Sequence, residues 1–108
     1  MTQRKIMTMQ ELYNLYKHLG AGEIVLDVRT PEEFAEAHVP GAINIDHEDV
    51  GRHAEKLKKY KTVYIHCRSG KRSLIAYDDL AAAGLNNLVC VTGSGMMDWL
   101  EAGYETES

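Results

Sequence analysis

The sequence predicts one α/β domain spanning residues 1–108, built on a mainly parallel β-sheet with helices on both faces. Short aliphatic runs alternate along the chain with segments whose apolar residues recur at helical spacing. Short connections join these elements, and strands that alternate with helices in this way pair in parallel with both faces covered. A chain of 108 residues also leaves no room for a second core of ordinary size.

The first predicted elements are a helix and a buried strand. Thr8 and Glu11 have the spacing of a capping box, in which each side chain satisfies a free amide at a helix start. Leucines at helical spacing follow, and Gly20 provides a helix stop. Residues 23–28 are aliphatic and β-branched but too few for a helix, so they are predicted as a strand.

A second helix and strand follow directly. Thr30 repeats the capping pattern with Pro31 at the first helical position, which predicts a short helix to about residue 37. Pro40-Gly41 then predicts a turn into a short strand over 42–45.

The segment 46–61 is polar and ends in a cluster of lysines. We interpret it as a solvated surface helix, since few of its side chains are apolar. Three of them can form one buried face: Val50, Ala54 and Leu57.

The second half of the chain repeats the strand and helix alternation. Residues 62–67 are predicted as a strand, and the helix that follows ends at Gly84. Residues 87–91 are predicted as another strand. A last helix after Gly95 carries Met96, Trp99 and Leu100.

Composition limits the classes of partner. Twelve Lys plus Arg against sixteen Asp plus Glu give a net charge of −4, which argues against nucleic acids and anionic membranes as partners. Two cysteines are too few for a disulfide scaffold, so a reducing, cytoplasmic location is expected. The N-terminal Met-Thr-Gln-Arg-Lys-Ile precedes no long apolar run, so neither a signal peptide nor a membrane span is expected.

Cys67 is the strongest candidate for chemistry. It lies at the end of a predicted strand, before a short loop with glycine and a helix, where backbone amides converge on the sulfur. Arg68, Lys71 and Arg72 place three of the twelve basic residues beside it. Amides and cations both favour thiolate over thiol, which predicts a nucleophile. The alternative is a buried strand-end cysteine beside solvated charges.

Three segments in order resemble a single-domain rhodanese. They are Asp27-Val-Arg-Thr-Pro-Glu-Glu-Phe34, His38-Val-Pro-Gly-Ala-Ile-Asn44 and His66-Cys-Arg-Ser-Gly-Lys-Arg-Ser73. Gly95, Trp99 and Gly103-Tyr104 extend the resemblance over nearly the whole chain. It implies a rhodanese-like fold with a central five-stranded sheet, and a sulfurtransferase that carries sulfane sulfur as a Cys67 persulfide.

The loop residues fit that chemistry. An amide cradle would stabilise the anionic outer sulfur, and the basic side chains would attract a small sulfur-containing anion such as thiosulfate. The acceptor is expected to be cyanide in vitro and a thiol, or a thioredoxin-like protein, in vivo. No cofactor is required, and a monomer or weak dimer is expected. The predicted donor-binding residues are Arg68, Ser69, Gly70, Lys71, Arg72 and Ser73, with helix capping as an equal alternative for Ser73.

Two other functions remain open. Cysteine-dependent phosphatases and arsenate reductases are disfavoured because the phosphatase loop places five residues between its Cys and Arg, whereas four separate Cys67 from Arg72. The other alternative is a non-catalytic rhodanese module that binds a partner protein.

Several other residues have a structural interpretation. Asp27 and Arg29 are predicted to support neighbouring loops rather than to react. His66 adjoins Cys67, but successive strand residues point to opposite faces, so a Cys–His dyad is not expected. Cys90 lies in an apolar run and is predicted to be inert. The histidines lack a zinc-binding spacing, so no metal site is predicted.

The last helix and the C-terminus give further expectations. Trp99 and Met96 are expected to fill the core. Met96 and Met97 also follow a Gly-Ser-Gly turn and, where exposed, would form an apolar rim of the pocket for a protein acceptor. The acidic residues after the helix are expected to form a frayed end: Glu101, Glu105 and Glu107.

Overall fold

The computed structural model describes residues 4–108; the first three residues of the N-terminal segment discussed above lie outside this range. It contains one five-stranded sheet in the order β1-β5-β4-β2-β3, and each neighbouring pair is parallel. The predicted α/β class and the parallel sheet are therefore confirmed. The strands are β1 (Ile6–Met7), β2 (Glu23–Asp27), β3 (Ile43–Asn44), β4 (Thr62–His66) and β5 (Leu88–Val91).

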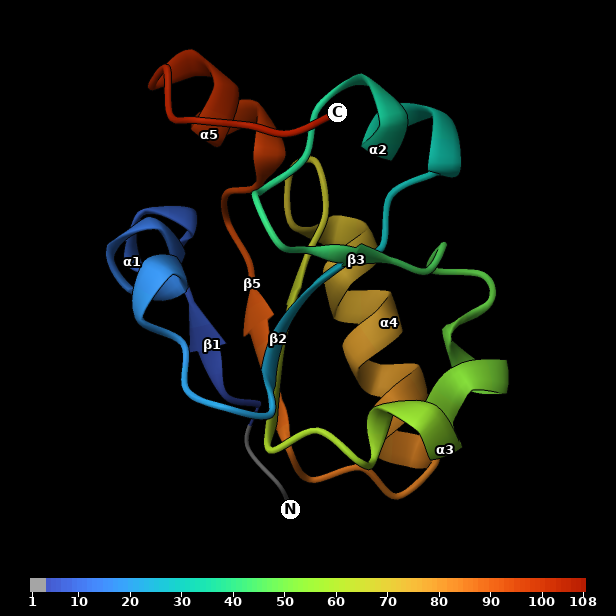
Figure 1. Cartoon of the computed structure of the whole chain (residues 1–108). Coiled ribbons are helices and arrows are strands. Elements are labelled where there is room, and N and C mark those ends of the chain that lie inside the picture. The colour runs from blue at the N-terminus through green and yellow to red at the C-terminus, as the bar shows by residue number, and fades with distance from the viewer. Residues whose placement is uncertain (1–3) are drawn as a thin grey trace.

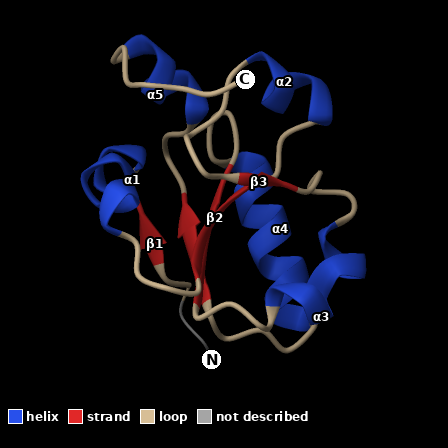
Figure 2. Cartoon of the chain, viewed as in Figure 1, coloured by secondary structure: helices blue, strands red, loops and turns tan. Residues whose placement is uncertain are grey.

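Helices cover both faces of this sheet and its carboxyl end. They are α1 (Met9–Leu15), α2 (Pro31–Glu36), α3 (Ala54–Leu57), α4 (Lys71–Ala82) and α5 (Met96–Glu101). Helices α3 and α4 lie on one face and α1 on the other (Figure 1). Helices α2 and α5 stand beyond the end to which the strand arrows point (Figure 2). Within residues 4–108, no helix is long and apolar enough to cross a membrane.

The core has two parts, one on each side of the sheet. Leu26, Ile65 and Cys67 pack with residues of α3 and α4. On the other face, Val25 and Val91 pack with α1 and α5. Because the central strands are buried on both faces, they read in the sequence as continuous apolar runs.

Local signals in the sequence placed the starts of α1 and α2 correctly. Both predicted capping boxes form: the Thr8 hydroxyl accepts from Glu11 N–H, and the Thr30 hydroxyl accepts from Glu33 N–H. The surface helix expected within 46–61 is shorter, a 3₁₀ turn over Val50–His53 followed by α3. Its three apolar residues are buried, as predicted: Val50, Ala54 and Leu57.

The edge strand β1 was not predicted. It has two residues and pairs with β5 through Ile6 and Cys90. An alternation pattern needs about four residues to be recognised, so a strand this short leaves no periodic signal.

The expectation of a frayed C-terminus is wrong. The backbones of His38 and Glu107 exchange two hydrogen bonds of 2.8 and 2.9 Å. The Trp99 indole donates to the Glu105 carbonyl at 2.8 Å, and the Tyr16 hydroxyl donates to the Glu105 carboxylate. These bonds hold the tail against α5, against the 3₁₀ turn Tyr16–His18 that follows α1, and against the loop before β3. Glu105 and Glu107 therefore act as anchors.

Candidate active site

Cys67 follows the carboxyl end of β4 directly, and its backbone contacts α5. Residues 67–70 form the turn from β4 into α4, at the end of the sheet where α/β proteins place their binding sites. The side chain of Cys67 is 1% exposed and packs on the α4 side of the sheet. A reacting sulfur must therefore enter the loop to reach this thiol.

One backbone amide of the loop contacts the Cys67 sulfur directly. Gly70 N–H donates to Cys67 Sγ at 3.1 Å. Gly70 has φ of +109°, and a Cβ there would lie 2.7 Å from the Gly93 nitrogen, so only glycine fits the turn. Helix α4 starts immediately afterwards without a side-chain cap. The amides of its first turn lack acceptors within the helix, and its positive end lies beside the thiol.

The Ser73 side chain contacts the loop that carries Cys67. Its buried hydroxyl lies 3.0 Å from the Gly70 carbonyl and 2.7 Å from the Val91 carbonyl, so its one proton has two available acceptors. Cys67 Sγ lies 3.5 Å from the same oxygen. The helix cap is Gly70. The hydroxyl therefore joins the loop to β5 and touches the sulfur, and it does not cap the helix.

Helix α5 supports the other side of the loop. Met96 N–H donates to the Cys67 carbonyl at 2.8 Å, and Met97 N–H donates to the Arg68 carbonyl at 3.2 Å. A Cβ at Gly95 would collide with both carbonyl oxygens. The close approach of α5 therefore requires glycine at this position.

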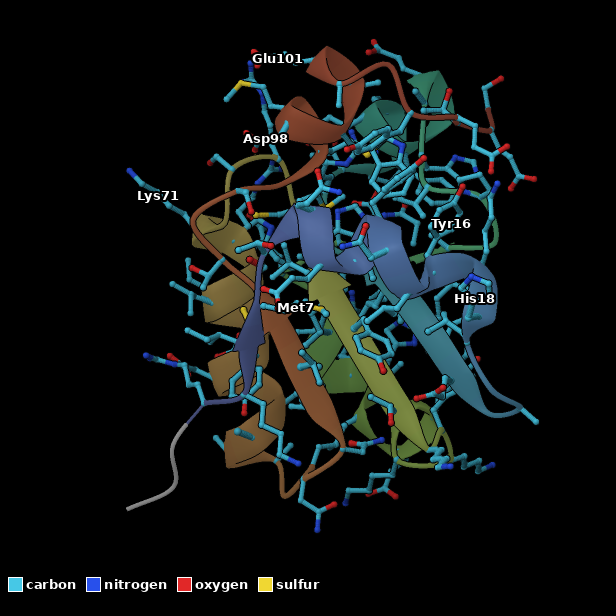
Figure 3. The ribbon with its side chains drawn as sticks, turned by 90° about the vertical axis from the view of Figure 1, so that its left-hand side faces the viewer. Met7, Tyr16, His18, Lys71, Asp98 and Glu101 are labelled. Atoms are coloured by element: carbon cyan, nitrogen blue, oxygen red, sulfur yellow. The ribbon has the colours of Figure 1, made fainter. Side chains whose placement is uncertain are left out.

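The basic side chains of the loop are not equivalent. Arg68, Ser69 and Lys71 are exposed, and Lys71 extends away from the molecule (Figure 3). Arg72 is partly buried and forms two hydrogen bonds with Glu33, at 2.7 and 3.1 Å. The charge of Arg72 is therefore already balanced by a carboxylate, a pairing that the sequence did not indicate.

Glu33 is the site residue that sequence reasoning missed. Its carboxylate also accepts from the Thr30 amide at 3.1 Å. Hydrogen bonding to Arg72 lowers the pKa of Glu33 to about 2 despite an opposing effect of burial. The sequence showed Glu33 only as part of a helix-start signal, and nothing local indicates its pairing with α4.

Asp27 and Arg29 form a buried ion pair beside the loop. Arg29 Nη2 donates to Asp27 Oδ2 at 2.7 Å, and Arg29 Nε lies 3.0 Å from both carboxylate oxygens. Arg29 Nη2 also donates to the Ala37 carbonyl at 2.7 Å, while the Asn44 amide donates to the carbonyls of Asp27 and Arg29. These contacts join β2, α2 and β3.

His66 does not form a dyad with Cys67. Its ring lies on the Asp27 side, with Nε2 3.8 Å from Asp27 Oδ2 and Nδ1 3.4 Å from the Cys67 carbonyl oxygen. Complete burial lowers the pKa of His66, which keeps the ring neutral.

Cys90 and Met96 are both buried. Cys90 is fully buried, and burial raises the pKa of its thiol to about 11. Cys67 and Cys90 are both free thiols. Met96 is fully buried, whereas Met97 is 41% exposed. Met96 therefore lies in the core, the interpretation preferred from the sequence, and of the two methionines only Met97 is exposed.

The fold and the loop define a class: a parallel α/β domain that holds a buried cysteine, hydrogen-bonded by a backbone amide, just before the start of a helix. The family model of the rhodanese-like domain matches residues 10–102, and the chain belongs to this family.

Relatives and solved structures agree with this assignment. Thiosulfate sulfurtransferase 16 of Arabidopsis thaliana is 33% identical over 102 residues, which cover 83% of this chain and 84% of that protein. A Bacillus subtilis relative is 37% identical over 75 residues, 69% of this chain but only 40% of that longer protein. A rhodanese-like domain protein from Staphylococcus aureus superimposes with a TM-score of 0.78 at 32% identity, covering 96% of this chain and 99% of the other.

Proposed function

We propose that this protein is a sulfurtransferase that carries sulfane sulfur as a persulfide on Cys67. The observation that carries the proposal is the 3.1 Å hydrogen bond from Gly70 N–H to Cys67 Sγ at the start of α4. A sulfur held there as an anion is stabilised by an oriented amide and by the positive end of the helix.

The first half-reaction loads the cysteine. The Cys67 thiolate attacks the outer sulfur of a donor such as thiosulfate, forming a new S–S bond. The S–S bond of the donor breaks, and sulfite leaves with the electron pair. Thiolate and thiosulfate become persulfide anion and sulfite, so total charge is conserved and no cofactor takes part.

The Gly70 amide and the start of α4 would stabilise the persulfide formed in this step. The persulfide places its negative charge on the outer sulfur, one bond beyond Sγ and towards the amides of the first turn of α4. Four residues separate Cys67 from Arg72, and Arg72 is neutralised by Glu33. A phosphoryl group carries more charge and needs a larger loop, which supports sulfur as the transferred atom.

The second half-reaction empties the cysteine. A thiophilic acceptor, cyanide in vitro or a thiol, attacks the outer sulfur, and Cys67 leaves as the thiolate. The small donor anion would meet the exposed cations of the loop, Arg68 and Lys71, before it reaches the sulfur.

The test compares two assays on the same protein. The first measures thiocyanate formed from thiosulfate and cyanide, and the second measures hydrolysis of an aryl phosphate. Thiocyanate formation that is absent in Cys67→Ser supports the proposal. Aryl phosphate hydrolysis without thiocyanate identifies a phosphatase instead. Absence of both activities leaves the partner-binding module as the better account.

A further inference from the structure

A cavity of about 390 Å³ lies beside the loop that carries Cys67. Its lining comes from Arg29 before α2, from α2 itself, from Arg68 in the loop and from α5. Two backbone hydrogen bonds, from Met96 to the Cys67 carbonyl and from Met97 to the Arg68 carbonyl, fix the α5 wall of this cavity directly against the loop. A molecule that approaches Cys67 from this side must cross the cavity.

The unpaired charges of this cavity are mainly acidic. Arg29 and Glu33 line it, but the ion pairs described above neutralise both. Glu36, Glu101 and Arg68 complete the charged lining, and within the described range 4–108 none of these three forms an ion pair. The approaching molecule therefore meets two free carboxylates and one free guanidinium.

An apolar strip completes the same wall. Met97 and Leu100 lie one turn apart on α5 and are 41% and 50% exposed. An exposed methionine adapts its shape to different apolar partners. This combination of apolar and acidic groups suits a polypeptide with a basic and an apolar side chain better than a small inorganic anion.

On the basis of the sulfurtransferase function proposed above, we propose that the sulfur acceptor is a cysteine in a polypeptide segment, next to a Lys or Arg and an apolar residue. The basic side chain pairs with Glu36 or Glu101, and the apolar side chain packs on Met97 and Leu100. An acidic residue beside the acceptor cysteine is repelled by the two carboxylates.

The transfer step is balanced without a further reagent. The acceptor thiolate attacks the outer sulfur of the Cys67 persulfide and forms a new S–S bond. The bond from that sulfur to Cys67 Sγ breaks, and its electron pair stays on Cys67 as the thiolate. Two anions react and two anions are formed.

The experiment separates loading from transfer. The protein is loaded with thiosulfate, freed of donor and mixed with capped peptides of one length that contain Cys with Leu and either Lys or Glu beside it. Intact mass follows the loss of sulfur from the protein. We expect the Lys peptide to remove sulfur at least about threefold faster than the Glu peptide, as exposed charge pairs of this kind allow, with a difference that shrinks as salt is added.

Variants assign the preference to the cavity. The double variant Glu36→Gln with Glu101→Gln should load normally and react with both peptides at nearly equal rates. Glu32→Gln, an exposed position on α2 outside the cavity, should keep the preference. Equal rates in the wild-type protein, or a preference that persists in the double variant or disappears in Glu32→Gln, would overturn the inference. Failure of the wild-type protein to gain sulfur refutes the sulfurtransferase function, and the inference with it.

Discussion

Glu33 and Arg72, 39 residues apart in sequence, form a two-point ion pair that fastens the start of α4 to α2. The Glu33 carboxylate also completes the capping box of its own helix through Thr30. One side chain thus links the helix after Cys67 to the segment that carries the buried Asp27–Arg29 pair. The loop is held by neighbours on both sides, with α2 on one and α5 on the other.

Glu33→Gln should lower the free energy of unfolding by about 1–2 kcal/mol at pH 7, because the charge-assisted bonds to Arg72 are lost. The pKa of Glu33 falls from 4.5 to about 2 on folding. A lowered pKa stabilises the fold above pH 4.5, and this stabilisation disappears as the pH falls towards 2. Urea unfolding at a series of pH values should show that the variant and the wild type differ by a constant free energy of unfolding near neutrality. This difference should become smaller below pH 4.5. A difference independent of pH would contradict the role of the ion pair.

Gly95→Ala should lower stability by about 2–3 kcal/mol and reduce turnover, because a Cβ collides with the carbonyls of Cys67 and Arg68. Gly51→Ala is the matched control, since a Cβ there meets nothing within 4 Å and its φ lies outside the left-handed region. Urea unfolding and the thiocyanate assay measure the two effects. Equal behaviour of the two variants would show that α5 does not hold the loop.

Asp27→Asn should lower the free energy of unfolding by about 3 kcal/mol, because it leaves the Arg29 guanidinium buried without its counter-charge. The remaining folded protein should still accept sulfur from thiosulfate, since neither residue of the pair contacts the Cys67 sulfur in the described range 4–108. The measurement compares urea unfolding with the loaded fraction by intact mass. A variant of normal stability that no longer loads would give Asp27 a direct part in the chemistry.

Cys90 should resist alkylation by iodoacetamide at pH 8, because it is fully buried and its thiol has a pKa of about 11. Cys90→Ala should retain turnover and lose only about 1–2 kcal/mol of stability. Peptide mapping after alkylation and the thiocyanate assay provide the check. Loss of turnover equal to that of Cys67→Ser would instead indicate a relay between two cysteines.

Sequence reasoning succeeded where the signal is local. The capping residues Thr8 and Thr30 and the placement of Cys67 between a strand and a glycine-containing turn all depend on neighbours within a few positions. Long-range pairings left no such signal. The bond between Glu33 and Arg72 depends on how α2 and α4 are brought together by the sheet.

The same limit explains the errors at the two ends of the chain. Strand β1 exists because β5 offers an edge for Ile6 and Met7, not because two residues define a strand. Glu107 is ordered because His38 lies opposite its backbone. The acidic residues of the C-terminus, considered without the segment around His38, predict only a solvated end of the chain.

The most direct test of the account is the mass of the protein after incubation with thiosulfate, followed by peptide mapping. We expect the mass of one additional sulfur atom on the peptide that contains Cys67, in the wild type and in Cys90→Ala, and none in Cys67→Ser. Sulfur on Cys90, a gain that persists in Cys67→Ser, or no gain in the wild type would contradict the central claim that Cys67 carries the persulfide.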